Sequence, residues 1–262
     1  MPSLNPEVEQ RVDILSQVLD ANLSSLGALV REKRKFKLGI VQQLLTGTKR
    51  FPEFVDSSAT QAGVFKELPA DWKILKIGDI AAESVDRGET DGAIVYSCTK
   101  HDGLVPSLEY FGRQVFSRNL NAYKRLNVGD FAYATNHIEE GSIGLLRKGG
   151  KPGLVSPMYT VFHCHEVVNP EFLFAVLKTE NYRRIFESRM SASVDRRGSL
   201  RWKEFSKIRV PLPSLHEQDR IVRVLELLDS EIWKLDKQHE LLRRYKRGLM
   251  DRTFSGALSV AA

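Results

Sequence analysis

The stretch EKRKFKLGIVQQLLTGTKRF, residues 32–51, consists almost entirely of helix-forming residues and ends at a Thr-Gly pair. A diverged copy, LLRRYKRGLMDRTFSGALSV, occupies residues 241–260. Shifting one segment by 209 positions superposes Gly39 on Gly248, and the match continues upstream without a gap. Because one spacing is held over roughly forty residues, it indicates a duplicated structural unit.

Each copy predicts one long helix, because apolar residues recur at alternating steps of three and four. The first apolar seam consists of Val12, Leu15, Leu19, Leu26, Leu29, Phe36 and Ile40, and the second of Ile221, Val224, Leu228, Leu235, Leu242, Tyr245 and Leu249. Gly47 and Gly256 stand where a C-terminal helix cap belongs. We expect helices about 60 Å long that form a coiled coil. The alternative is two amphipathic helices that pack on an ordinary domain.

Polar residues interrupt both seams. Asn22 is equivalent to Glu231 in the repeat, and Lys33 interrupts the first seam at another layer. Such interruptions restrict the register and the choice of partner in a coiled coil.

The block between the two copies has a different character. Residues 52–67, PEFVDSSATQAGVFKE, are polar, small and aperiodic, which predicts a linker. After them, β-rich pieces (AIVYSC, DFAYAT, SIGLL, MYTVFHC) alternate with turn clusters (DRGETDG, KHDG, NVGD, KGGKPG). The stretch NPEFLFAVLKTENYRRIFESRM, residues 169–190, predicts an amphipathic helix with Asn169 as its cap.

These patterns predict an α/β (α+β) fold in which one globular domain is flanked by two long coiled-coil-forming helices. The predicted organisation is an N-terminal helix at 1–51, a linker at 52–67, the globular domain at 68–213 and a C-terminal helix at 214–262.

Composition limits the class of protein. The chain has 262 residues, 42% of them hydrophobic, and it contains no apolar run of membrane-spanning length. Met1 is followed by PSLNPEVEQR, which is unlike a signal segment, so we expect a cytoplasmic protein with no membrane partner. The cysteines, Cys98 and Cys164, lack the paired spacing of a zinc site, so we expect both to be reduced and structural.

Charge is concentrated in one segment. Between Lys178 and Arg209 there are ten basic and four acidic residues, an excess equal to the net charge of +6 of the whole chain. A basic segment of this kind hints at a polyanionic partner.

Several motifs together resemble the specificity subunit of type I restriction and modification systems. They are QQLLTGTKRF at the helix end, LPADWKILKIGDI, HIEEGSIGLL and GLVSPMYTVF within the domain, and SLRWKEFSKIRVPLPSLHEQDRIVRVLELLDSEI at its exit. The resemblance covers nearly the whole chain in the order of the family, and PLPSLHEQDRIV is its most specific part.

The resemblance implies a target recognition domain followed by a long conserved helix, a unit that occurs twice in a full subunit, with the helices antiparallel. This sequence departs from that pattern, because two helices flank only one recognition domain. We therefore expect a half-size subunit, or the rear half of a longer one.

The function implied by the resemblance is non-catalytic recognition of double-stranded DNA at a bipartite site. Methyltransferase (modification) subunits and restriction or translocase subunits are the implied partners. S-adenosylmethionine and ATP with Mg²⁺ would be carried by those partners, and no cofactor is expected in this chain.

Motifs for catalysis or metal binding are weak. NPEF at 169–172 lacks the second Pro of the amino-methyltransferase loop, and helix capping by Asn169 and Pro170 explains it. HCHE at 163–166 could place two histidines for a metal, but a core strand with alternating burial is the simpler interpretation. KGGKPG at 148–153 lacks the ending of a phosphate-binding loop and predicts a turn.

Basic and amide side chains remain as candidates for contact with DNA. Arginine and lysine reach phosphates and the O6 and N7 edge of guanine, and asparagine can read adenine. The strongest candidates are Arg196, Arg197, Arg201 and Lys203, around Gly198 in a predicted loop; the others are Lys100, His101, Tyr123, Lys124, Arg125, Asn136 and His137. The alternatives are a solvated charge cluster for the arginines and turn bracing for Asn136 and His137.

A chain with one recognition domain would rebuild the geometry of a full subunit by self-association through its helices. Two like chains normally pair about a two-fold axis, so the target would be an interrupted palindrome. A second hypothesis is a coiled-coil scaffold or decoy that binds the methyltransferase without reading DNA. A third, a self-sufficient nuclease or methyltransferase, is opposed by the missing motifs.

Overall fold

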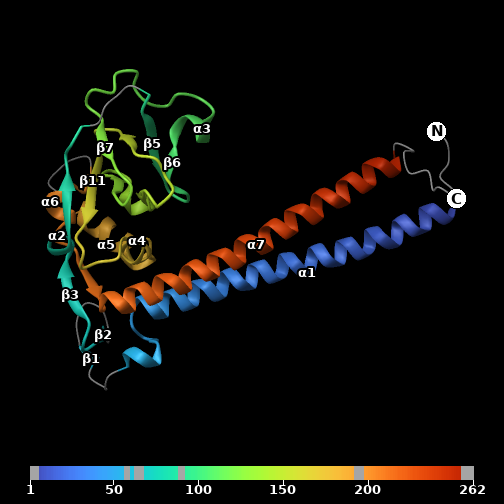
Figure 1. Ribbon diagram of the computed structural model, residues 1–262, viewed down its shortest axis with the longest axis horizontal. Coiled ribbons are helices and arrows are strands. Elements are labelled where there is room, and N and C mark those ends of the chain that lie inside the picture. Colours follow the sequence, from blue (N-terminus) through green and yellow to red (C-terminus); the bar gives the residue numbers. More distant parts are fainter. Residues whose placement is uncertain (1–5, 56–59, 62–67, 88–91, 192–197, 255–262) are drawn as a thin grey trace. The chain divides into compact units, whose positions relative to one another are not determined.

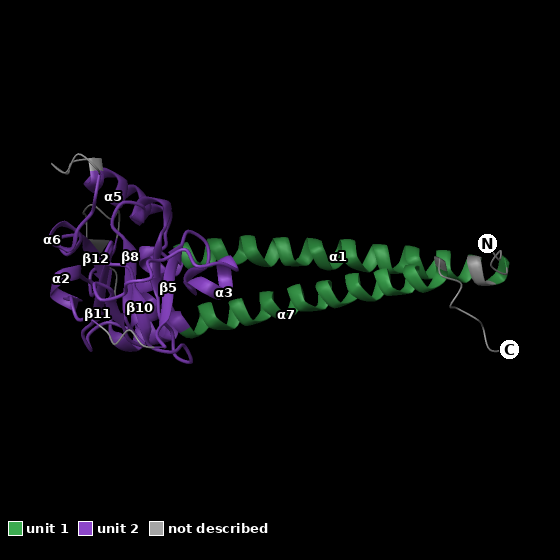
Figure 2. Cartoon of the chain, turned by 90° about the horizontal axis from the view of Figure 1, so that it is seen from above, with its two compact units in different colours: residues 1–42, 223–262 green, residues 43–222 purple. Residues whose placement is uncertain are grey.

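The chain divides into two compact units in a computed structural model that describes residues 6–55, 60–61, 68–87, 92–191 and 198–254. One unit comprises residues 43–222, and the other combines 1–42 with 223–262 (Figure 2). Helices and strands are both present, with long helices at the two ends of the sequence, so the predicted fold class is confirmed.

The helical unit is built from α1 (Pro6–Leu45) and α7 (Leu215–Phe254), which run side by side (Figure 1). Each helix has 40 residues, and both of its bounds are displaced by 209 positions from those of the other. The sequence repeat therefore corresponds to two equal helices. No helix in the described part of the chain has the length and apolar character needed to cross a membrane.

Ion pairs show that the two helices are antiparallel and related by a local two-fold symmetry. Lys37 pairs with Asp229, and Asp20 pairs with Lys246. In the repeat, Asp20 corresponds to Asp229 and Lys37 to Lys246, so the two pairs are one interaction made twice. A two-fold axis perpendicular to the helices would exchange them.

A third ion pair joins the polar interruptions of the two seams. Lys33 Nζ lies 2.8 Å from Glu231 Oε2. The interruptions expected to restrict register therefore contact each other directly.

The predicted seam of α1 is partly wrong, because only some of its members face α7. Leu19 is 6% exposed, whereas Leu15, Leu29 and Phe36 are 38%, 44% and 58% exposed. Val30, which was not assigned to the seam, is buried. The apolar positions of α1 therefore form two stripes, and packing within one chain covers only one of them.

Two four-stranded sheets form the centre of the unit of residues 43–222. The first has the order β6 (Gly103–Pro106), β5 (Ile94–Thr99), β10 (Gly153–Val155), β7 (Lys124–Leu126). The second has the order β4 (Ala81–Ser84), β11 (Tyr159–Cys164), β8 (Phe131–Ala134), β9 (Ile143–Leu145). Within these sheets β10 and β5 are parallel, and the other neighbouring strands are antiparallel.

Short elements complete the unit. Strand β3 (Lys73–Lys76) pairs with β12 (Arg209–Leu212), and β1 (Thr60–Gln61) pairs with β2 (Leu68–Pro69). The remaining helices are η1 (Pro52–Phe54), α2 (Ile77–Ile80), α3 (Ser107–Phe111), η2 (Ile138–Glu140), α4 (Pro170–Leu177), α5 (Glu180–Ser191) and α6 (Trp202–Phe205). The predicted linker thus contains two short ordered elements, η1 and β1.

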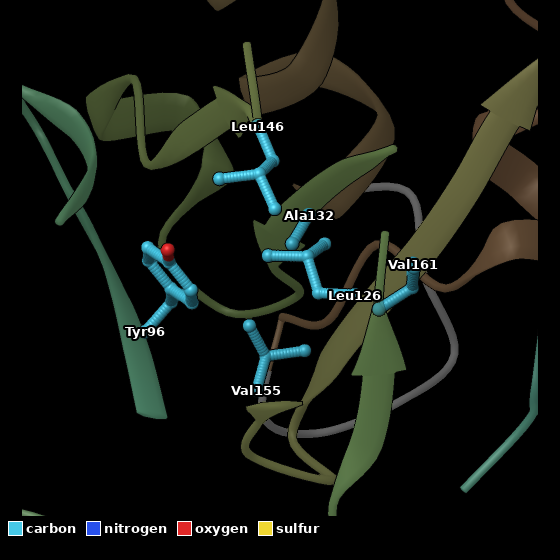
Figure 3. Packing of buried hydrophobic residues seen from close by; sticks show 6 residues of the cluster. All are labelled: Tyr96, Leu126, Ala132, Leu146, Val155 and Val161. Carbon is cyan, nitrogen blue, oxygen red and sulfur yellow. The ribbon is translucent and has the colours of Figure 1, made fainter. Parts of the chain in front are cut away.

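The core lies between the two sheets. Figure 3 shows six of its residues: Tyr96, Leu126 and Val155 from the first sheet, Ala132 and Val161 from the second, and Leu146 just after β9. Side chains alternate between the faces of a strand, so Ala132 and Val161 mark the inner face of the second sheet.

Aromatic side chains cover the other face of the second sheet. Phe131 stacks on Phe162 at 4.6 Å between ring centroids, and Phe162 lies 5.4 Å from both Trp202 and Phe205. Three successive residues of β11 are buried, because both faces of this sheet are covered. The core-strand interpretation of HCHE at 163–166 holds only in part, because β11 ends at Cys164 and both His163 and His165 are exposed.

The helix predicted at 169–190 is broken into α4 and α5. Asn169 caps α4 by accepting hydrogen bonds from the backbone N–H groups of Glu171 and Phe172, which confirms helix capping as the role of NPEF. Helix α4 ends at Leu177 with Lys178 as its C-cap, and the hydroxyl of Thr179 donates to Val176 O at 2.8 Å. This local hydrogen bond competes with helix propagation at the break.

Candidate nucleic-acid interface

Lys178 holds two loops of the compact unit together. Its Nζ donates to Lys100 O at 3.0 Å, in the turn between β5 and β6, and to Gly141 O at 2.8 Å, just after η2. Burial lowers the pKa of Lys178 from its ordinary value. This ammonium is therefore a structural crosslink that places the Lys100 turn beside η2.

A second set of hydrogen bonds joins three segments, at Thr135, Met158 and Leu200, and Thr135 lies just before η2. Leu200 N donates to Thr135 O at 2.7 Å, and the Thr135 hydroxyl donates to Met158 O at 3.3 Å. Arg201 follows Leu200 and Asn136 follows Thr135, so these two predicted contact residues lie on adjoining segments.

A pocket of about 310 Å³ opens beside these segments. Its polar lining consists of Tyr96, Ser97, Ser117, Tyr123, Asn136, Ser156 and Tyr159, and its apolar lining of Val95, Val115, Phe116 and Met158. Met158 and Val115 are exposed. The pocket therefore offers hydroxyl and amide groups with apolar side chains beside them, a combination suited to hydrogen-bonding planar groups.

The tyrosines fix the walls of this pocket. The Tyr96 hydroxyl donates to Lys151 O at 2.8 Å, while the Tyr123 and Tyr159 hydroxyls accept from Ser117 N at 3.1 Å and Cys98 N at 3.4 Å. In contrast, the Asn136 side chain has no hydrogen-bond partner among the residues that the structure describes. Among the described residues, the side-chain amide of Asn136 is thus a group of the pocket lining that can still form hydrogen bonds to a ligand.

The other predicted contact residues differ in how accessible they are. Lys100 and His101 are exposed in the β5–β6 turn, and Arg125 is exposed on β7, where its Nε donates to Asn127 Oδ1 at 3.0 Å. Tyr123 is only 6% exposed. Lys124 Nζ donates to Tyr159 O at 2.7 Å, so this ammonium supports the pocket wall.

His137 lies near two carboxylates. Its Nδ1 is 3.2 Å from Glu140 Oε1, and His137, Glu139 and Glu140 form a group whose ligand atoms lie close together. Within the described ranges, His163 and His165 belong to no such group, and their rings are 6.3 Å apart.

The basic segment 178–209 is partly neutralised by its own acids. Arg183 and Arg184 pair with Glu180 at 2.9 and 3.5 Å, and Lys207 pairs with Glu204 at 2.6 Å. Arg201 and Lys203 are exposed at the start of α6. Arg196 and Arg197 lie outside the described residues. The excess positive charge therefore falls on fewer side chains than the sequence count suggests.

Sequence reasoning missed Lys178 and most of the pocket lining, notably Tyr96, Met158 and Tyr159. The signal for Lys178 was its place at the end of an apolar helix, where a charged residue that becomes buried needs partners. The pocket left no local signal, because its lining comes from segments far apart in the sequence.

The cysteines are partly buried. Cys98 and Cys164 are free thiols, and burial raises the pKa of each to about 12. A thiol that stays protonated at neutral pH is a poor nucleophile and metal ligand.

Comparison with known proteins identifies relatives of one kind. The chain is 28% identical over 208 residues to the type I restriction enzyme MjaVIII specificity subunit of Methanocaldococcus jannaschii, covering 73% of this chain and 45% of that protein. It is 24% identical over 202 residues to the putative type I restriction enzyme MjaX specificity subunit of the same organism, covering 72% and 47%. The chain thus spans about half the length of these curated relatives.

Solved structures show the same fold. The HsdS subunit from Thermoanaerobacter tengcongensis matches with a TM-score of 0.54 at 16% identity, over 98% of this chain and 60% of that one. The type-I restriction-modification system S subunit from M. genitalium matches with a TM-score of 0.56 at 14% identity, over 94% and 60%.

A family profile gives the most direct assignment. The type I restriction modification DNA specificity domain matches residues 69–243, which include most of the α/β unit and the first part of α7. Since this match covers well over half of the chain, the protein belongs to the family of type I restriction modification DNA specificity domains.

Proposed function

We propose that this chain is a non-catalytic reader of DNA sequence that directs partner subunits to a bipartite site. The observation that carries the proposal is the specificity-domain match across residues 69–243. The relatives named above are specificity subunits of restriction enzymes, which favours the same role here.

The loops around the pocket are the proposed face for DNA. Phosphate contacts position a protein on a duplex, whereas contacts to base edges specify the sequence. Lys100 and Arg201 are exposed cations suited to phosphate or guanine. Asn136 carries an amide of the type that reads adenine, without a hydrogen-bond partner among the residues that the structure describes. Arg196 and Arg197 remain predicted DNA contacts because they belong to the basic stretch around Gly198 in the sequence.

The uncovered stripe of the helical unit is the proposed surface for protein partners. It contains Leu15, Val18, Leu29 and Phe36 on α1 and Leu227, Leu241 and Tyr245 on α7, all exposed. Val18 corresponds to Leu227 in the repeat and Phe36 to Tyr245, so both helices expose apolar residues at equivalent positions. Exposed apolar surface of this kind marks interaction sites. Methyltransferase and restriction subunits are the proposed occupants, and they would carry S-adenosylmethionine and ATP with Mg²⁺.

Self-association through the same helices is part of the proposal. Two chains related by a two-fold axis would present identical recognition domains to opposite DNA strands. The expected target is then an interrupted palindrome. Light scattering on the purified chain, followed by mapping of methylated sites, tests this; a target with two unlike halves contradicts it.

A gel shift at moderate salt, with and without the methyltransferase subunit, tests the proposed function itself. Preferred retardation of one duplex sequence supports a reader of DNA. Binding to the methyltransferase without any DNA preference supports the scaffold or decoy hypothesis instead. Salt concentration is held fixed, because counterion release makes all such affinities salt-dependent.

A further inference from the structure

Buried charge lies where the two long helices enter the unit of residues 43–222. Leu44 and Leu45 at the end of α1 are buried, and Glu217 in the first turn of α7 is only 1% exposed. A buried carboxylate is costly unless it is paired and hydrogen-bonded. The groups around Glu217 therefore decide how firmly this helix end is held.

Arg50, which follows α1 in the chain, satisfies Glu217. Its Nε and Nη2 donate to Glu217 Oε1 and Oε2, both at 2.8 Å. Its Nη1 and Nη2 also donate to Asp71 Oδ1 and Oδ2, at 2.9 and 2.7 Å. Trp72 Nε1 donates to Glu217 Oε2 at 3.1 Å. A planar guanidinium that binds two carboxylates bidentately strongly restricts the geometry of all three side chains.

The pKa of Arg50 is consistent with this pairing. Hydrogen bonding to Glu217 raises it above its ordinary value, and burial opposes that effect. The side chain of Arg50 is 9% exposed. The ion pair of Arg50 with Glu217 is thus shielded from solvent.

Gln218 and Asp219 attach the same turn of α7 to a different segment. Gln218 is fully buried; its Oε1 accepts from Asn169 N at 2.8 Å, and its Nε2 donates to Pro213 O at 3.0 Å. Asp219 Oδ1 accepts from Asn169 Nδ2 at 2.7 Å. Three successive residues of α7 therefore bind the chain after α1 and the cap of α4.

We call Arg50, Asp71, Trp72, Glu217 and Gln218 the helix joint. Buried ion pairs add little net stability compared with apolar packing, but in some systems they select one arrangement over others. None of the five lines the pocket, and none is a predicted DNA contact. Their geometry restricts how both helix ends are attached to one domain.

We propose that the helix joint is a positioning device that sets the gap between the two DNA half-sites, with no effect on which bases are read. The proposal rests on the proposed function, since a gap exists only if two recognition domains act together. α7 is unbroken from the joint to Phe254, and α1 ends at Leu45, shortly before Arg50. A loosened attachment would therefore let a domain reach neighbouring spacings.

Selection from a random duplex DNA library tests this with the full-length chain in complex with its methyltransferase subunit. Sequencing of the bound DNA gives two independent readouts, the base frequencies in each half-site and the distribution of gap lengths. The variants are Glu217→Gln, which keeps the shape and removes the charge, and Trp72→Phe, which removes one donor. The matched control is Glu53→Gln, which breaks an exposed pair with Arg220, 3.4 Å, beside the same turn of α7.

For Glu217→Gln we expect the preference for the best gap over gaps one base pair longer or shorter to fall about tenfold, the effect of losing one charge-assisted hydrogen bond. Base frequencies stay unchanged. Trp72→Phe shifts the distribution in the same direction by less, and Glu53→Gln leaves it unchanged.

A folded Glu217→Gln variant with the gap distribution of the wild type overturns the proposal. If that variant does not fold, Trp72→Phe decides, and an unchanged distribution again overturns it. Wild-type protein that selects half-sites with no fixed gap also contradicts the proposed role of the helix joint, but not the proposed reading of DNA sequence. Wild-type protein that selects no sequence contradicts the proposed function itself.

Discussion

The helical unit and the helix joint use the same kind of ion pair in opposite surroundings. In the helical unit, the side chains of Lys37 and Asp229 are 28% and 60% exposed, whereas those of Arg50 and Glu217 in the joint are 9% and 1% exposed. Exposed pairs contribute about 0–1 kcal/mol, but removal of one partner from a buried pair costs several times more. The exposed pairs therefore select register, while the buried ones make the attachment of the helices costly to disturb.

The helical unit also buries fewer apolar side chains than the unit of residues 43–222 does. Among the described residues of the helical unit, the buried apolar side chains are Leu19, Val30, Leu225 and Ile232. The other unit has a core between two sheets and a second aromatic layer. The helical unit is therefore the part of the described chain with the fewer buried apolar side chains, which is why we proposed it as the surface for partner chains.

The largest expected effect comes from breaking the joint. Glu217→Ala leaves the Arg50 charge without its main buried partner, and we expect a loss of about 3–5 kcal/mol in the free energy of unfolding of that unit. Urea unfolding followed by tryptophan fluorescence measures it, because Trp72 and Trp202 lie in this unit. Glu53→Ala is the control, and an equal loss there would abolish the contrast between buried and exposed pairs.

DNA affinity should respond to residues that are not part of the helix joint. For Arg201→Ala we expect about 1–3 kcal/mol of lost affinity with relaxed base preference if the guanidinium reads guanine. If it contacts phosphate, the loss is uniform across sequences and the salt slope falls by about 1. Gel shifts at several salt concentrations separate these results, and unchanged binding would move the DNA face elsewhere.

Neutralising both symmetric pairs of the helical unit should have a smaller effect. We expect Asp20→Asn with Asp229→Asn to change stability by less than about 1 kcal/mol, since both carboxylates are exposed. Fluorescence of Trp233, which lies in α7, reports on this unit. A cost as large as that of Glu217→Ala would show that register and stability are coupled here.

The smallest effect concerns the thiols. Since the pKa of Cys98 is raised to about 12, the folded protein keeps its proton at pH values where an unfolded thiol, with a pKa of about 8.5, has lost it. The contribution of the neutral Cys98 thiol to the free energy of unfolding is therefore fully present below a pH of about 8.5, and it is lost as the pH rises toward 12. Alkylation by iodoacetamide at pH 8.5 should be slow in native protein and fast in urea. Rapid native labelling would show that this core opens readily.

Features with a local or periodic signal were predictable. The two helices follow the repeat, the strands β8, β9 and β11 lie within the β-rich pieces, and β5 extends one residue beyond AIVYSC. Capping by Asn169 was predicted because it needs only neighbouring residues.

Features made by distant segments were not predictable. Arg50 and Glu217 are separated by 167 positions, and no composition or period links them. The break between α4 and α5 and the double coverage of β11 depend on packing partners that a linear pattern does not name. In the candidate site, Tyr123 and Asn136 were named from their types, but their shared pocket follows from sheet pairing.

The antiparallel pairing of α1 and α7 has a consequence for biosynthesis. The first helix ends at Leu45 and the second begins at Leu215, so the ribosome must complete the recognition domain before the partner of α1 exists. At about 5–20 residues per second, this interval lasts on the order of 10–40 seconds. During that time both apolar stripes of α1 lack α7, and closure of the joint waits as well. We therefore expect nascent chains to need chaperones, or the α7 helix of a finished copy, to cover these stripes.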